Sequence, residues 1–153
     1  MQQILRYVSD TKDRGLLYQI HMAERLFGYT NTDWIGNASD GRSTSSFAFP
    51  LQSVAIAWSS KKQPTIALSI TEAEYQEAVI ATCEAIWLKR LLKDLQVKVF
   101  DPTTIYSENL NNIQLVKNPV FHARNKHIEV HYHFFHEHLL SGEVEIVYVS
   151  MDR

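Results

Sequence analysis

The sequence predicts an α/β fold in which helices cover a mixed β-sheet. In its first part, residues 25–32, 44–51 and 54–60 are strand-like and separated by polar turn-forming segments, which is typical of an antiparallel meander. From about Thr71 the apolar residues recur at steps of three and four instead, which indicates a long helix. A short strand at 103–107 follows, and a helical crossover should place it parallel to an earlier strand.

The N-terminal elements follow from local patterns. Residues 2–13 carry apolar residues at helical spacing, and Gly15 ends this predicted helix. Residues 16–20, LLYQI, form a further predicted strand before the meander. The polar stretch at 37–46 is predicted to be a turn rather than a linker, because strand-like sequence resumes directly after it.

The second half of the chain alternates helices and strands. The apolar stripe of the long helix comprises Ala78, Ala81, Ala85, Leu88, Leu92 and Leu95. Residues 108–118 should turn helical before Pro119 stops them. A helix is also predicted within 127–142, where Gly142 supplies the C-terminal stop, and residues 143–149 then alternate like a strand.

Composition bounds the class of protein. The chain has 153 residues, which is enough for one compact domain, and its net charge of −2 argues against a strongly basic protein. Contact with nucleic acid would therefore depend on local basic patches. Cys83 is the only cysteine, so no internal disulfide forms, and we expect it to be a small buried hydrophobe. Without a signal peptide or long apolar run, the expected location is intracellular, in the cytoplasm or nucleus.

Glu74 stands out because it continues the apolar stripe of the long helix. One step of four back from Ala78 reaches this carboxylate, on the face expected to pack against the sheet. A capping box of Thr71 and Glu74 would explain it without any function, but Ser69 and Glu72 form an equally good box. The alternatives are therefore a cap, a solvated charge, or a metal-binding or catalytic role.

Other acidic and amide side chains gather near predicted strand ends. Glu108 follows the strand at 103–107, where sites form in open α/β sheets, although an acid in the first turn of a helix needs no function. Asn31 and Asp33 are two residues apart in a strand, so they share one face about 7 Å apart. Asparagine is also common at strand ends for turn reasons alone.

Histidines and basic residues offer weaker signals. His127 and His131 have the spacing of two zinc ligands on one helix face, but no cysteine pair or HExxH motif accompanies them, and packing of a helix explains them better. Small basic clusters are also present, and each is either a solvated surface or a contact for phosphates. The residues that we assign to nucleic-acid binding are Lys61, Lys62, Arg124 and Lys126.

Several long strings then occur in order. "YTNTDWIGN" is similar to YSDADWAGD, "GRSTSSFAF" to RKSTSGYVF, and "IAWSSKKQPTIALSITEAEY" to ISWSSKKQPTVALSTTEAEY. These are strings of the RNase H domain in the Pol polyprotein of copia-type retrotransposons, which the chain resembles over about residues 4 to 150. The resemblance implies a five-stranded mixed sheet of order 3-2-1-4-5, with residues 1–20 as a connection segment after a reverse transcriptase and residues 21–153 as the RNase H-like domain.

The resemblance also implies an activity and a site. The family hydrolyses RNA in RNA–DNA hybrids at four carboxylates that bind two Mg²⁺ or Mn²⁺ ions. Reverse transcriptase and integrase parts belong to the same polyprotein. The first aspartate falls on Asn31, the glutamate on Glu74, and a second aspartate on Glu108. The fourth belongs to a helix after the last strand, and the chain ends at "VSMDR" before that helix.

These departures predict a degenerate site with weak or no hydrolysis, because an amide at position 31 removes a charge from a cluster that holds dications. One alternative is an active endoribonuclease in which Glu74, Glu108 and Asp33 bind the metal. Another is a domesticated, non-catalytic interaction module.

Overall fold

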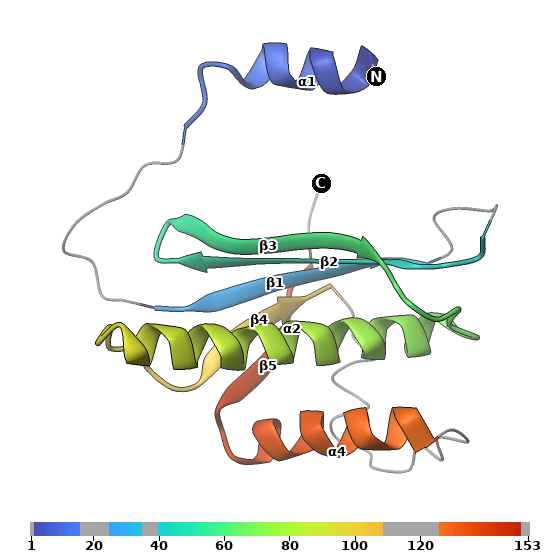
Figure 1. Cartoon of the computed structure of the whole chain (residues 1–153), viewed down its shortest axis with the longest axis vertical. Helices are drawn as coiled ribbons and strands as arrows, with labels where there is room; N and C mark the ends of the chain where they lie inside the picture. The colour runs from blue at the N-terminus through green and yellow to red at the C-terminus, as the bar shows by residue number, and fades with distance from the viewer. Residues whose placement is uncertain (1, 16–24, 35–39, 109–125, 151–153) are drawn as a thin grey trace.

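The computed structural model describes residues 2–15, 25–34, 40–108 and 126–150. Its centre is a five-stranded mixed sheet with the strand order β3-β2-β1-β4-β5, which confirms the predicted order (Figure 1). Strands β1, β2 and β3 pair antiparallel, whereas β4 pairs parallel with both β1 and β5. The strands are β1 (Phe27–Asp33), β2 (Thr44–Leu51), β3 (Val54–Lys62), β4 (Thr103–Ser107) and β5 (Val144–Tyr148).

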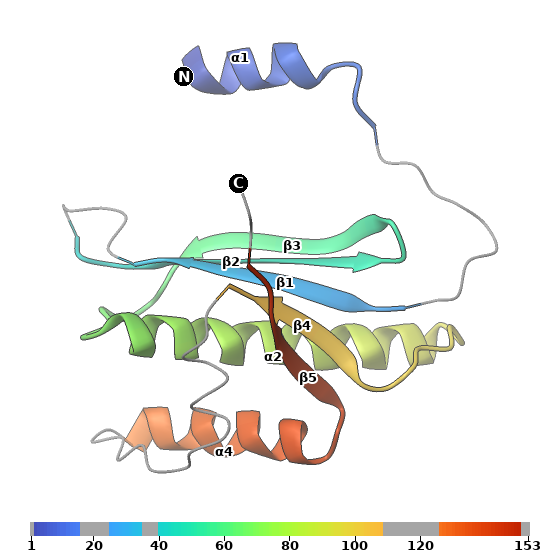
Figure 2. The same ribbon diagram turned by 180° about the vertical axis from the view of Figure 1, so that it is seen from behind.

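Helices α2 (Ile70–Asp94) and α4 (Lys126–Leu140) lie on one face of this sheet. Helix α2 runs across the face, and α4 packs beside α2 on its far side (Figures 1 and 2). Helix α1 (Gln2–Thr11) buries none of its residues, and its apolar side chains are exposed. The crossover through α2 joins the antiparallel strands to β4, which explains why β4 runs parallel to β1.

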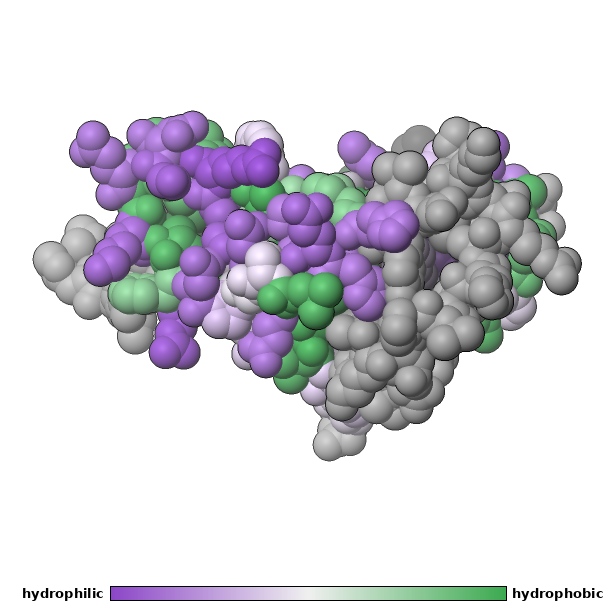
Figure 3. Space-filling view, turned by 90° about the horizontal axis from the view of Figure 1, so that it is seen from below, coloured by the Kyte–Doolittle hydropathy of each residue, from purple (hydrophilic) through white to green (hydrophobic). Residues whose placement is uncertain are grey.

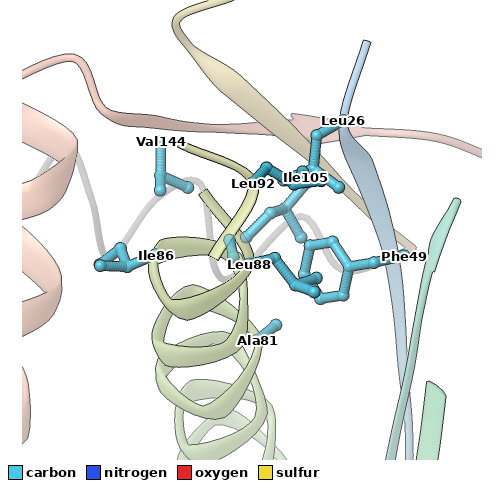
Figure 4. Close-up of a cluster of buried hydrophobic side chains, with 9 residues drawn as sticks. Leu26, Phe49, Ala81, Ile86, Leu88, Leu92, Ile105 and Val144 are labelled. Carbon is cyan, nitrogen blue, oxygen red and sulfur yellow. The ribbon is translucent and has the colours of Figure 1, made fainter. Parts of the chain in front are cut away.

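The core lies between α2 and the sheet. Phe49 projects from β2 toward α2 and meets Leu88, while Ile105 contributes from β4 (Figure 4). A second cluster joins α2 to α4 through Tyr75 and Phe135, whose rings pack edge to face with their centroids 5.7 Å apart. Burying these aromatic rings on both sides of α2 fixes its position over the sheet.

The structure corrects two expectations about α2. Leu95, predicted to end the apolar stripe, is 64% exposed because α2 ends at Asp94 and Leu95 is its C-cap residue. Cys83, expected to be buried, is exposed. It falls between the inward-facing Thr82 and Ala85, on the side of the helix turned away from the sheet. The predicted strand at 16–20 and the helix beyond Glu108 lie outside the described residues.

Hydrophilic side chains cover much of the surface seen from the helix side, with smaller hydrophobic groups between them (Figure 3). Among the described residues, no helix is long and apolar enough to cross a membrane.

Helix α2 begins where one of the two possible capping boxes places its start. The hydroxyl of Ser69 accepts a hydrogen bond from the main-chain N–H of Glu72 at 3.1 Å, and Glu72 in turn accepts from the N–H of Leu68 at 2.9 Å. These contacts satisfy two N–H groups near the start of the helix, which have no partner within it. The pair of Ser69 and Glu72 is therefore the cap, and Glu74 lies inside the helix.

We expect Ser69→Ala to lower the free energy of unfolding by about 1 kcal/mol, because it removes the acceptor for the N–H of Glu72. Urea unfolding followed by circular dichroism measures this change. Thr71→Ala is the matched control, since Thr71 lies after the helix start, and it should change stability less. Equal losses in both variants would contradict the assignment of the cap.

Candidate functional site

The carboxyl ends of β1 and β4 meet at one end of the sheet. These parallel strands pair Gly28 with Ile105 and Thr30 with Ser107. The next residue on each strand is Asn31 and Glu108, respectively, so the two predicted site residues emerge side by side. This juxtaposition is what the βαβ topology requires of neighbouring parallel strands.

Asn31 and Glu108 lie on the sheet face that points away from α2. Both are exposed, and both line a shallow hollow of about 340 Å³ together with Tyr29 and Tyr106. The rings of those two tyrosines stack with their centroids 5.4 Å apart. Strand alternation explains the arrangement, because the buried Thr30 points toward α2 and its neighbour Asn31 must point away.

Glu74 lies on the other side of the same strand ends. It is only 7% exposed, on the face of α2 that packs against the sheet, as its position in the apolar stripe predicts. Its carboxylate therefore lies on the helix side of the sheet, whereas the side chain of Asn31 leaves from the opposite face.

A second buried carboxylate, Glu77, was missed by the sequence analysis. It is 2% exposed, and the hydroxyl of Thr32 donates a hydrogen bond to its Oε2. Its Oε1 is buried without a hydrogen-bonding partner. The signal was present in the sequence, because one step of four back from Ala81 reaches Glu77, just as the step from Ala78 reaches Glu74.

Burial raises the pKa of Glu77 from its ordinary value to about 8. Desolvation disfavours the charged form, and the negative charges of Glu74 and Glu108 add to this effect. The hydrogen bonds from Thr32 and from the main chain of Asn31 oppose it only in part. The carboxyl of Glu77 is therefore mostly protonated at neutral pH, and three acidic side chains lie close enough to interact electrostatically.

The remaining predicted site residues lie around this end of the sheet or outside the described part. Asp33 is exposed on the same strand face as Asn31 and pairs with Thr44, which in turn pairs with Lys62. The exposed Lys61 and Lys62 end strand β3 at this edge, and the ammonium of Lys62 pairs with Asp40. Arg124 and the side chains of Lys126, His127 and His131 lie outside what is described.

The described acidic side chains offer few ligands for a metal ion. Within the described ranges, no three His, Cys, Asp or Glu side chains converge to hold a metal together, so these residues do not form a four-carboxylate centre. Mg²⁺, however, is commonly bound by one or two carboxylates, with waters and substrate phosphates as the other ligands. Glu74 and Glu77, both buried and both oxygen donors, fit that smaller requirement.

Comparison with known proteins gives relatives and a fold. The chain is 37% identical over 150 residues to the retrovirus-related Pol polyprotein from transposon RE2 of Arabidopsis thaliana, covering 98% of this chain and 10% of the relative. It is 38% identical over 147 residues to the corresponding polyprotein from transposon TNT 1-94 of Nicotiana tabacum, covering 96% of this chain and 11% of that relative. The chain thus spans about a tenth of the length of these relatives. No protein-family model matches the chain.

Solved structures support the fold. The LC11-RNase H1 isolated from compost by a metagenomic approach superposes with a TM-score of 0.58 at 12% identity, covering 85% of this chain and 87% of that one. RNase H1 from the archaeon Halobacterium salinarum gives a TM-score of 0.53 at 13% identity, covering 83% and 86%. The strand order, the crossover helix and these similarities agree: the chain has an RNase H-like fold and matches a part of retrovirus-related Pol polyproteins from transposons.

Proposed function

We propose that this chain is the part of a retrotransposon Pol polyprotein that binds RNA–DNA hybrid, and that it hydrolyses the RNA strand only weakly. The observation that carries the proposal is that the predicted site residues do not converge: Asn31, a neutral amide, stands beside Glu108 on one face of the sheet, whereas Glu74 is buried on the other. A neutral amide holds a dication less strongly than a carboxylate, because it contributes no charge.

Two further features support weak catalysis. Glu108 is one methylene longer than an aspartate, and a misplacement of about 1 Å can cost about 100-fold in rate. Asp33 keeps a carboxylate on the strand face of Asn31, but it lies about 7 Å further along. When bound, Mg²⁺ or Mn²⁺ would supply an activated water and stabilise the leaving oxygen, and Glu74 and Glu77 are the candidate residues to hold it.

Binding of the hybrid has separate support. LC11-RNase H1 has been solved in complex with an RNA/DNA hybrid, and that structure superposes with a TM-score of 0.50 at 11% identity. In the present chain, Lys61 and Lys62 lie at the same edge of the sheet as Asp33, where they could contact phosphates. By the same proposal, residues 1–20 are a connection segment after a reverse transcriptase, and an integrase belongs to the same polyprotein.

A cleavage assay tests the activity. We expect slow, Mn²⁺-dependent cleavage of a hybrid labelled on its RNA strand. Combining Asn31→Asp with Glu108→Asp should raise the cleavage rate by about tenfold or more, because the first change restores a negative charge and the second restores the shorter side chain of an aspartate. Glu74→Gln should abolish what cleavage there is. Gel retardation of the same hybrid, with the metal chelated, measures binding separately.

The outcomes separate the alternatives. Efficient cleavage by the unmodified chain that Asp33→Asn abolishes would replace the weak-activity proposal with a site built on Glu74, Glu108 and Asp33. Failure to retard the hybrid, together with no cleavage in any variant, would leave an interaction module without nucleic-acid function.

A further inference from the structure

We propose that Glu74 and Glu77, on the helix side of β1, form a two-carboxylate site for a divalent cation such as Mg²⁺ or Mn²⁺. This inference concerns the same site as the proposed function and rests on it for the ion's role, but it can be tested by ion binding alone.

The helix places the two carboxylates together. Glu74 and Glu77 are three residues apart on α2, and side chains at this spacing are neighbours on one helix face. That face packs against the sheet, and the two residues are 7% and 2% exposed. Two carboxylates buried this deeply repel each other unless a proton or a cation lies between them.

The hydrogen bonding of Glu77 leaves one oxygen available. Thr32 donates to Oε2 and so orients the carboxyl group, whereas Oε1 is fully buried and meets no hydrogen-bonding partner. An acceptor oxygen left without a partner inside a protein carries a free-energy cost that a bound cation would remove. The oxygen therefore points to a ligand rather than to a completed structural contact.

Contacts with β1 hold Glu77 in place. Its hydroxyl donor, Thr32, directly follows Asn31 in the strand, and the main chain of Asn31 also hydrogen-bonds to Glu77. The carboxyl group of Glu77 is thus held against β1 from the helix side, on the face opposite the side chain of Asn31.

The competing explanation is that Glu77 is a protonated carboxyl that only tethers α2 to β1. Both explanations include the contact with Thr32, but they differ in what removing the acid does to ion binding. A tether affects stability alone, whereas a ligand affects the affinity for the cation as well.

Titration calorimetry with Mn²⁺ at mildly alkaline pH, on the whole chain, separates them. We expect Glu77→Gln to weaken Mn²⁺ binding by about tenfold or more, since even the loss of a residue that only hydrogen-bonds to a metal ligand lowers metal affinity by that much. Glu84→Gln, which removes an acid from a less buried position on the same helix, is the matched control and should bind like the unmodified chain. Circular dichroism confirms that each variant is folded.

Each result decides the matter. Equal Mn²⁺ affinity in Glu77→Gln and the unmodified chain, or no binding by the unmodified chain at millimolar Mn²⁺, overturns the proposal. If Glu77→Gln does not fold, Glu77→Asp replaces it, and a shortened acid that leaves affinity unchanged counts against the proposal equally. Glu77-dependent Mn²⁺ binding without any hybrid cleavage would support this inference while refuting the proposed hydrolysis.

Discussion

With the metal chelated, the free energy of unfolding of this chain is expected to fall by on the order of 4 kcal/mol as the pH rises from about 4.5 to about 8. The cause is Glu77, whose pKa is raised from 4.5 to about 8 in the folded chain, mainly by burial. Between these two values the folded chain holds a proton that the unfolded chain has released. Stability is therefore greatest below the lower value and is lost as the pH passes through the higher one.

Glu77→Gln isolates this contribution. Glutamine keeps the shape of the side chain and an oxygen that can accept from Thr32, but it does not titrate, so its stability should vary much less over the same range. Groups far from residue 77 contribute equally to both profiles, and subtracting the two profiles removes them. Urea unfolding at a series of pH values, in the presence of EDTA, gives both curves. Parallel curves would show that Glu77 ionises as readily in the folded chain as in the unfolded one.

The periodicity of the sequence was enough to predict the layers of the fold. Alternating strands and a change to helical spacing near Thr71 predicted the sheet, its crossover and the helix that covers it, and the resemblance supplied the order of the strands. The bounds of β2 and β4 agree with the prediction to the residue, because turn-forming residues delimit both strands. Leu95 was assigned wrongly because periodicity alone does not tell where a helix ends.

The candidate site was predicted less completely, for physical reasons. Helical spacing led to Glu74, but Glu77 belongs to the same inward face, and an interpretation based on apolar residues passes over acids inside the stripe. Which face of β1 carries Asn31 depends on where α2 packs, and that is a tertiary property. The pairing of Thr32 with Glu77 joins residues 45 positions apart, which no local pattern contains.

Gly28→Ala is expected to destabilise the chain by about 2 kcal/mol, because the added methyl group has no room. Gly28 lies on the face of β1 that meets α2, and a Cβ placed there would be 2.4 Å from Cε1 of Phe49. Phe49 is fully buried in the cluster between β2 and α2, so its ring cannot move aside without disturbing the packing around it (Figure 4). Gly15→Ala is the control: nothing lies within 4 Å of the new Cβ, and its effect should stay within about 0.5 kcal/mol.

A double-mutant cycle tests whether the collision with Phe49 is the cause. Phe49→Leu opens the space that the ring occupies, at its own cost in packing. Gly28→Ala should then be less damaging by about 0.5 kcal/mol or more in the Phe49→Leu background than in the unmodified chain, since residues in contact are not additive. Additive effects would mean that the glycine is needed for the main-chain conformation of β1 instead. The comparison shows whether Gly28 is required because it leaves room for the ring of Phe49 over β1.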